Sequence, residues 1–196
     1  MSLFPANPNR NVYLAFFLEV FEIVIISAAI ILPIRYFLIQ PFYVKGASME
    51  PNFYDSEYLI IDELSYRFRD PERGEIVVFR YPKDRSEFFI KRVIGLPGET
   101  VEVSNGQVTV YNADHPNGSI LDEPYLIDSI TSGTHKLTLG ENEYYVLGDN
   151  RGASLDSRIF GEVPRRELIG RVWVRGLPLS RVGMFDPPNY EITSQD

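Results

Sequence analysis

Apolar and polar positions divide this 196-residue chain into two unlike parts. Residues 1–11 form a short polar tail, whereas residues 12–40 are mostly apolar and residues 23–34 carry no charge. With its flanks, the apolar stretch reaches the roughly 20 residues that a helix needs to cross a bilayer. Glu22 and Arg35 lie near its two ends, where a charge is tolerated. We therefore predict a membrane-anchoring helix over residues 12–40; a long amphipathic or buried helix is the alternative.

Beyond Pro41 the pattern changes to short apolar runs separated by Gly, Pro, Asn and Asp, which is typical of β-strands. The runs lie at 58–62, 75–79, 88–94, 100–103, 107–111, 144–147 and 172–175. Asn105-Gly106 between two of them predicts a hairpin turn. One short helical turn is expected at 164–168. The sequence thus predicts a mainly β body over residues 41–190, arranged as a coiled, barrel-like sheet or a sandwich.

Two segments of this body are more polar than the rest. Residues 111–142 are rich in Asn, Asp, Ser, Thr and Gly, and we predict a small insertion there that the chemistry does not require. Residues 187–196 are expected to form a frayed tail.

Composition removes several classes of function. The chain has no cysteine, which excludes disulfides, thiolate catalysis and cysteine-ligated metals. Its two histidines, His115 and His135, lie in polar, turn-like sequence, so neither a multi-histidine metal site nor a Ser-His-Asp triad is expected. A net charge of −8 argues against nucleic acid as a partner. We predict no metal and no cofactor, and chemistry built from Ser, Lys, Asp or Glu.

Four segments carry candidate chemistry: 44–53 (VKGASMEPNF), 73–82 (RGEIVVFRYP), 88–99 (FFIKRVIGLPGE) and 148–161 (GDNRGASLDSRIFG). Lys91 stands inside an apolar run of the third, and Ser48 stands in a Gly-containing loop of the first. Each has an ordinary explanation, because a loop serine is commonly a turn residue and a strand lysine can protect a sheet edge. The core of the second segment is expected to be a buried strand.

Together, Ser48 and Lys91 suggest a nucleophile and its general base. A normal lysine has a pKa of about 10.4, so only about 0.04% of it is a neutral amine at pH 7. Lowering that pKa to about 7 means destabilising the ammonium by about 4.6 kcal/mol, which desolvation can supply. The apolar neighbours of Lys91 provide such an environment. A neutral amine could then take the Ser48 proton and later return it to a leaving amine.

The segments GASMEP, GEIVVF, IKRVIGLPGE and GDNRGASLDSR, in this order behind an apolar helix, resemble bacterial type I signal peptidases over residues 20–185. The resemblance implies a membrane-anchored serine endopeptidase that removes signal peptides, with small residues at −1 and −3, from exported preproteins. It further implies single-pass insertion in the cytoplasmic membrane, contact with lipid, and a catalytic body of the family's β fold on the extracytoplasmic side.

By motif match, the resemblance makes Ser48 the nucleophile, Lys91 the base and Ser154 the hydroxyl that orients the Lys91 amine. It also implies an ion pair of Asp156 with Arg158, and Asp149 paired with Arg92 or Arg158. Gly148 and Asn150 would hold the turn that presents Ser154. The expected substrate pockets are lined by Phe42, Val44, Met49, Phe53 and Ile90.

Two positions depart from the family pattern. Gly46 stands where some members carry a serine that helps the oxyanion hole, and Phe53 stands where leucine is common. A narrower pocket at Phe53 would favour Ala or Gly at −1. Two other functions stay open: an autoproteolytic transcriptional regulator with a similar Ser–Lys fold, and a membrane-anchored β-domain that binds peptides without cutting them.

Overall fold

The computed structural model describes residues 8–37, 39–126, 130–187, 190 and 192–194. The chain separates into two units, Met1–Ile39 and Gln40–Asp196. The first contains α1 (Pro8–Phe37), and its segment Val12–Leu32, with mean hydropathy 2.5, is long and apolar enough to cross a membrane. The predicted apolar helix is confirmed, but it begins at Pro8, inside the expected tail 1–11. Proline suits a first helical position because no helical partner is needed for its missing N–H.

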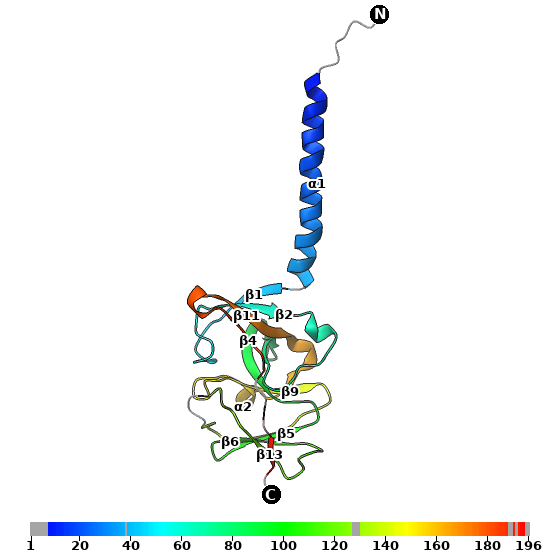
Figure 1. Ribbon diagram of the computed structural model, residues 1–196. Coiled ribbons are helices and arrows are strands. Elements are labelled where there is room, and N and C mark those ends of the chain that lie inside the picture. Colours follow the sequence, from blue (N-terminus) through cyan, green and yellow to red (C-terminus); the bar gives the residue numbers. More distant parts are fainter. Residues whose placement is uncertain (1–7, 38, 127–129, 188–189, 191, 195–196) are drawn as a thin grey trace, which may run out of the picture. The chain divides into compact units, whose positions relative to one another are not determined.

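The second unit consists mainly of two open β-sheets (Figure 1). The larger sheet has the order β1 (Ile39–Tyr43), β2 (Tyr58–Asp62), β11 (Leu168–Leu177), β3 (Ile76–Tyr81), β4 (Asp84–Gly95), β9 (Glu143–Leu147) and β10 (Val163–Pro164), with β12 (Gly183–Met184) paired to β11. The smaller has the order β13 (Ile192–Ser194), β7 (Ser119–Leu121), β6 (Gln107–Tyr111), β5 (Thr100–Ser104) and β8 (His135–Thr138). In the described part of the chain neither sheet closes into a barrel.

The predicted mainly β class is confirmed, and each predicted run coincides with a strand, except that Glu75 at the start of one run precedes β3. The Asn105-Gly106 turn joins β5 to β6, with Ser104 opposite Gln107. The helical turn expected at 164–168 is the 3₁₀ turn η2 (Arg165–Glu167); the other short helical elements are α2 (Ser157–Phe160), η1 (Ser65–Arg67) and η3 (Leu179–Arg181). The run IVVF of β3 does not alternate because both faces of the strand are buried: Val77 and Phe79 pack into one apolar cluster, and Ile76 and Val78 into another.

The two polar segments of the body contain short strands. The polar stretch 111–142 contributes β7 and β8 to the smaller sheet. The tail expected to be frayed from Pro187 onward contains β13, which pairs antiparallel with β7. β7, β8 and β13 form because they extend the hydrogen-bonded ladders on either side of the β5–β6 hairpin. Tyr190 also packs against the apolar cluster between these strands and β9.

A buried cluster supports the region where Ser48 lies. Its members are Val44, Met49, Phe53, Leu59, Ile61, Ile76, Val78 and Val172. They come from the Ser48 loop and from β2, β3 and β11, and most of them are less than 5% exposed. The loop therefore rests on well-packed apolar side chains, which fix its position against the sheet.

Candidate active site

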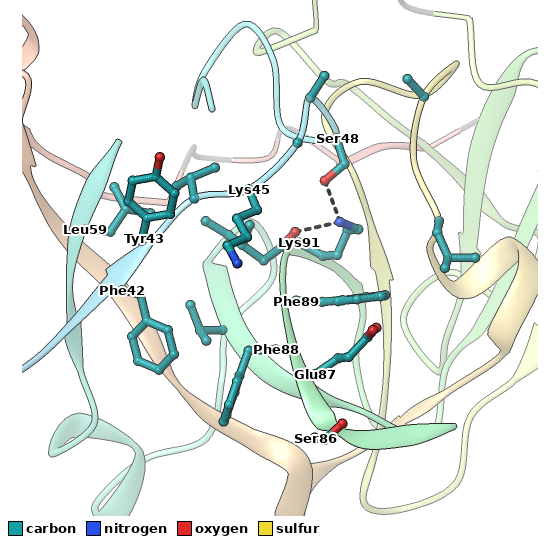
Figure 2. Close-up of a pocket in the computed structure, with 17 residues that line it drawn as sticks. Phe42, Tyr43, Lys45, Ser48, Leu59, Ser86, Glu87, Phe88, Phe89 and Lys91 are labelled. Atoms are coloured by element: carbon teal, nitrogen blue, oxygen red, sulfur yellow. Dashed lines mark hydrogen bonds between the residues drawn. The ribbon is translucent and has the colours of Figure 1, made fainter. Parts of the chain in front are cut away.

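Ser48 and Lys91 meet in an open cleft of ≈ 660 Å³. Ser48 lies on the loop after β1, and Lys91 lies on β4. Ser48 Oγ and Lys91 Nζ are hydrogen-bonded at 2.6 Å, and Lys91 Nζ also donates to the carbonyl oxygen of Ile90 at 2.8 Å. Figure 2 shows both bonds and the two walls of the cleft, formed by residues 42–48 and 86–91. The expected nucleophile and base are thus in contact.

The Ser48 loop is held at both ends by hydrogen bonds. Gly46 has φ +82°, a conformation that other residues adopt only with strain, and its N–H donates to Asp55 Oδ1 at 2.7 Å. On the other side, the Asn150 N–H donates to the Ser48 carbonyl oxygen at 3.0 Å, and Asn150 Nδ2 donates to the Ala47 carbonyl oxygen at 3.1 Å. Asn150 therefore ties the loop after β9 to the nucleophile loop.

Burial makes Lys91 a better base. The residue is 4% exposed, and its Nζ lies 5.4 Å from the centre of the Phe89 ring. Burial lowers the pKa of Lys91 to about 8, against the smaller opposing effect of the Asp156 and Asp149 carboxylates, which raise it. At a pKa of 8 about a tenth of the lysine is neutral at pH 7, compared with well under a thousandth of a normal lysine.

The two carboxylates near Lys91 are each paired with an arginine. Asp149 accepts from Arg92 Nε at 2.8 Å and from Arg92 Nη2 at 2.6 Å, so the structure selects Arg92 rather than Arg158 as its partner. Asp156 accepts from Arg158 Nε and Nη2, both at 2.8 Å, and from the Gly148 N–H at 3.1 Å. Their charges are therefore largely neutralised at close range, which limits their pull on the Lys91 proton.

Ser154 lies close to the pair, but the structure shows no hydrogen bond between it and Lys91. Ser154 Oγ is buried and has no partner among the described residues. A Cβ on Gly148 would lie 2.2 Å from Ser154 Oγ and 2.5 Å from the Ser48 carbonyl oxygen, so Gly148 is where these two serines approach the turn. The role of Ser154 in orienting the amine stays a prediction.

The residues expected to line the substrate pockets fall into two groups. Phe42, Val44 and Ile90 line the cleft. Met49 and Phe53 are 1% and 0% exposed and lie in the apolar cluster below the loop, where Phe53 packs on the Phe185 ring at 4.5 Å between ring centres. They do not line the cleft, so the structure shows no direct contact through which Phe53 would narrow the −1 pocket.

Sequence reasoning missed several lining residues: Tyr43, Lys45, Leu59, Val78, Phe88 and Phe89. Alternation along β4 could have found Phe88, because it faces the same side of the strand as Ile90. Leu59 and Val78 had no local signal, since their places depend on how β2 and β3 pair with distant strands.

Comparison with known proteins gives a family match over most of the chain. The family described as "Signal peptidase, peptidase S26" matches residues 17–176. "Probable signal peptidase I-2" of Synechocystis sp. is 42% identical over 91% of this chain and 80% of its own length. "Signal peptidase I" of Leptolyngbya laminosa is 39% identical over 83% of this chain and 81% of its own.

A crystal structure of a signal peptidase I from Enterococcus faecalis is 33% identical and aligns with a TM-score of 0.46, covering 53% of this chain and 97% of that one. The extent of the family match, together with the identities to the Synechocystis and Leptolyngbya relatives, shows that the chain belongs to the signal peptidase family, peptidase S26.

Proposed function

We propose that Ser48 and Lys91 are the catalytic pair with which this membrane-anchored peptidase removes signal peptides from exported preproteins. The observation that carries the proposal is the 2.6 Å contact between Ser48 Oγ and Lys91 Nζ, both of which line an open cleft. A nucleophile and base within hydrogen-bond reach are the geometric requirement for this chemistry.

In the first half of the reaction, neutral Lys91 Nζ accepts the Ser48 hydroxyl proton while Oγ bonds to the carbonyl carbon of the −1 residue. The tetrahedral intermediate collapses when the peptide C–N bond breaks and Nζ returns the proton to the leaving amine. The bond from Nζ to the Ile90 carbonyl oxygen fixes one N–H and so helps to aim the lone pair at Ser48. In the second half, Nζ takes a proton from water while the water oxygen bonds to the acyl carbon. The bond from that carbon to Ser48 Oγ then breaks, Nζ returns the proton to Oγ, and the signal peptide leaves with a new carboxylate.

The sheet offers the substrate two free strand edges. β4 pairs with β3 from Asp84 to Arg92, but with β9 only from Arg92 onward, so one edge of residues 84–91 has no partner strand in the described part of the chain. β1 is the terminal strand of the same sheet. Because the cleft lies between residues 42–48 and 86–91, an extended peptide can form main-chain hydrogen bonds there.

The same arrangement favours small side chains beside the cleaved bond. In an extended peptide the −1 and −3 side chains point to one face. On that face they would meet apolar side chains of the cleft that also contains Ser48, among them Val44 and Ile90. We therefore retain the expected preference for small residues at −1 and −3.

The anchor sets where this reaction takes place. We assign α1 to the cytoplasmic membrane, with lipid around it, and the catalytic unit to the extracytoplasmic side. This is the side on which an exported chain presents the end of its signal peptide. Protease added to sealed, right-side-out vesicles would degrade the catalytic unit; protection from protease would contradict the assignment.

The test is cleavage of a preprotein with an Ala-x-Ala site by the full-length protein in detergent. Lys91→Ala should abolish the mature product, whereas Lys45→Ala, which removes another lysine of the same cleft, should leave product formation largely intact. Equal cleavage by the wild type and Lys91→Ala would rule out the mechanism. Failure of the folded wild type to cleave would favour the peptide-binding alternative.

A further inference from the structure

The polar segment 111–142 reaches the catalytic pair through Arg92. Arg92 follows Lys91 on β4, so its side chain points to the opposite face of the strand. It is 4% exposed, holds Asp149 through two hydrogen bonds, and donates to the Gly74 carbonyl oxygen at 2.9 Å. The Tyr125 ring covers the guanidinium, with Arg92 Cζ 3.8 Å from the ring centre. Tyr125 thus lies against the ion pair that neutralises a carboxylate near Lys91.

Tyr125 is itself fixed by several partners. Its hydroxyl donates to Glu123 Oε1 at 2.6 Å and accepts from the Tyr190 hydroxyl at 3.1 Å. Its carbonyl oxygen accepts from Asn52 Nδ2 at 3.0 Å, and the same Nδ2 donates to Asp149 Oδ2 at 2.8 Å. Asn52 stands shortly after Ser48 in the chain, so Tyr125 is connected to the nucleophile loop and to Asp149 at once.

Glu123 extends the connection to the turn behind Ser48. It accepts from Arg151 Nη1 at 2.9 Å and from Nη2 at 2.5 Å. Arg151 Nε donates to the Gly148 carbonyl oxygen at 3.0 Å, and its Nη1 also bonds to Thr131 Oγ1. Gly148 lies directly against Ser48 and Ser154. Two arginines that support the site, Arg92 and Arg151, are therefore both held by the same polar segment.

We propose that Tyr125 is a positioning residue for the Ser48–Lys91 pair, acting by shielding the Arg92–Asp149 ion pair from water. The inference rests on the proposed function of that pair. In a shielded site the ion pair keeps its geometry and Asp149 stays neutralised. Without the aromatic ring, water reaches the ion pair and the Arg92 side chain becomes more mobile. The Lys91 ammonium is then better solvated, and the positive charge of Arg92 destabilises it less.

The charged groups around Lys91 set the direction of the effect. Asp149 and Asp156 raise its pKa, while burial lowers it. Arg92 and Arg158 neutralise these two carboxylates, and Glu123 neutralises Arg151. Loss of the Tyr125 ring weakens the neutralisation of Asp149 by Arg92 and reduces the burial of Lys91. Both changes raise the pKa of Lys91. The acid limb of the pH profile should therefore move to higher pH.

The experiment compares kcat/KM for a preprotein across pH 6–10 in the full-length wild type, Tyr125→Leu, Tyr125→Phe and the control Tyr111→Leu. We expect Tyr125→Leu to move the limb upward by about half a unit, which is about a threefold loss at pH 7 and almost none near pH 10. Tyr125→Phe keeps the ring and should stay close to the wild type. Tyr111→Leu removes a hydrogen bond to Glu102 on the smaller sheet and should leave the acid limb where it is in the wild type.

A limb that stays in place in Tyr125→Leu, or a loss of the same size at every pH, overturns the proposal. If Tyr125→Leu does not fold, Tyr125→Met, which fills the space without a planar ring, carries the same prediction. Lys91→Ala measured in parallel separates this outcome from failure of the proposed function: cleavage by Lys91→Ala would reject the catalytic pair, whatever Tyr125 does.

Discussion

Ser48 Oγ and Lys91 Nζ lie 2.6 Å apart although 43 positions separate the two residues in the chain. The second partner of Nζ is the neutral carbonyl oxygen of Ile90, and no carboxylate forms an ion pair with Lys91 within the described ranges. An ammonium in this place is buried without a counter-ion in contact, which disfavours the charged form. The Lys91 amine is thus both within hydrogen-bond reach of the Ser48 hydroxyl and basic enough in its neutral form for the proposed reaction.

The first prediction concerns the pH dependence of cleavage. Because burial lowers the pKa of Lys91 to about 8, kcat/KM should rise about tenfold per pH unit below that value and level off above pH 9. Initial rates at low preprotein concentration between pH 6 and 10 measure this limb. A limb centred near 10, as for an exposed lysine, would show that Lys91 is not the titrating base.

The second prediction concerns stability. Lys91→Met should abolish cleavage but raise the free energy of unfolding by about 3 kcal/mol at pH 7, because the wild type buries an ammonium whose pKa falls from 10.5 to about 8 on folding. Between pH 8 and 10.5 the unfolded chain binds more protons at this site than the folded one. The wild type therefore gains stability as pH rises, and the advantage of the variant shrinks.

Denaturant unfolding, followed by fluorescence of the single tryptophan Trp173, measures this difference at pH 7 and pH 10. The control is Lys45→Met, which removes an exposed lysine of the same cleft and should change stability little at either pH. An advantage of Lys91→Met that is as large at pH 10 as at pH 7 would contradict the buried-ammonium explanation.

Features of the fold that are written in local sequence were predictable. The β5–β6 hairpin was readable from Asn105-Gly106, and β4 from its apolar run with Lys91 inside it. β8 could not be predicted, because Leu137 is the only large apolar side chain among its four residues. Its residues alternate between half-buried and exposed, so none of them is fully buried. β7 and β13 are three residues each, too short to show a period. These strands depend on pairing with distant partners.

The same division applies to the site. Lys91 was recognisable because a lysine inside an apolar run is unusual, while Ser154 and Asp156 came only from the family resemblance. Tyr125 had no signal of either kind. Its position over Arg92 depends on tertiary contacts with Arg92, Asn52 and Tyr190, which are distant in sequence, and polarity alone suggested a dispensable loop. The contacts of Glu123 and Tyr125 with the two arginines are the basis of the proposed role of Tyr125, and the dispensability of the segment stays a prediction.

The third prediction tests Ser154. Its Oγ is buried and has no partner in the part of the chain that the structure describes, so Ser154→Ala should leave stability unchanged or raise it by up to about 1 kcal/mol, because none of the hydrogen bonds seen there is lost. If the hydroxyl orients the Lys91 amine once substrate is bound, kcat should nevertheless fall at least about tenfold.

Ser157→Ala is the matched control. Its Oγ accepts from the Val146 N–H at 2.9 Å, so it should lose about 1–2 kcal/mol of stability. Wild-type kcat in folded Ser154→Ala would remove Ser154 from the mechanism.

The fourth prediction concerns Gly148, where the turn after β9 touches the nucleophile loop. A methyl group there would lie 2.5 Å from the Ser48 carbonyl oxygen and 2.2 Å from Ser154 Oγ, and backbone cannot move aside as a flexible side chain can. Gly148→Ala should displace Ser48 from Lys91 and lower kcat/KM about 100-fold, because a shift of about 1 Å is enough for such a loss.

Gly152→Ala provides the comparison, since its nearest neighbour is Asn150 Oδ1 at 4.0 Å and the residue is exposed. Its kcat/KM should stay within about twofold of the wild type, as expected for a surface change. Preprotein cleavage by the two folded variants decides the matter: equal activity would mean that Ser48 does not depend on this turn for its position.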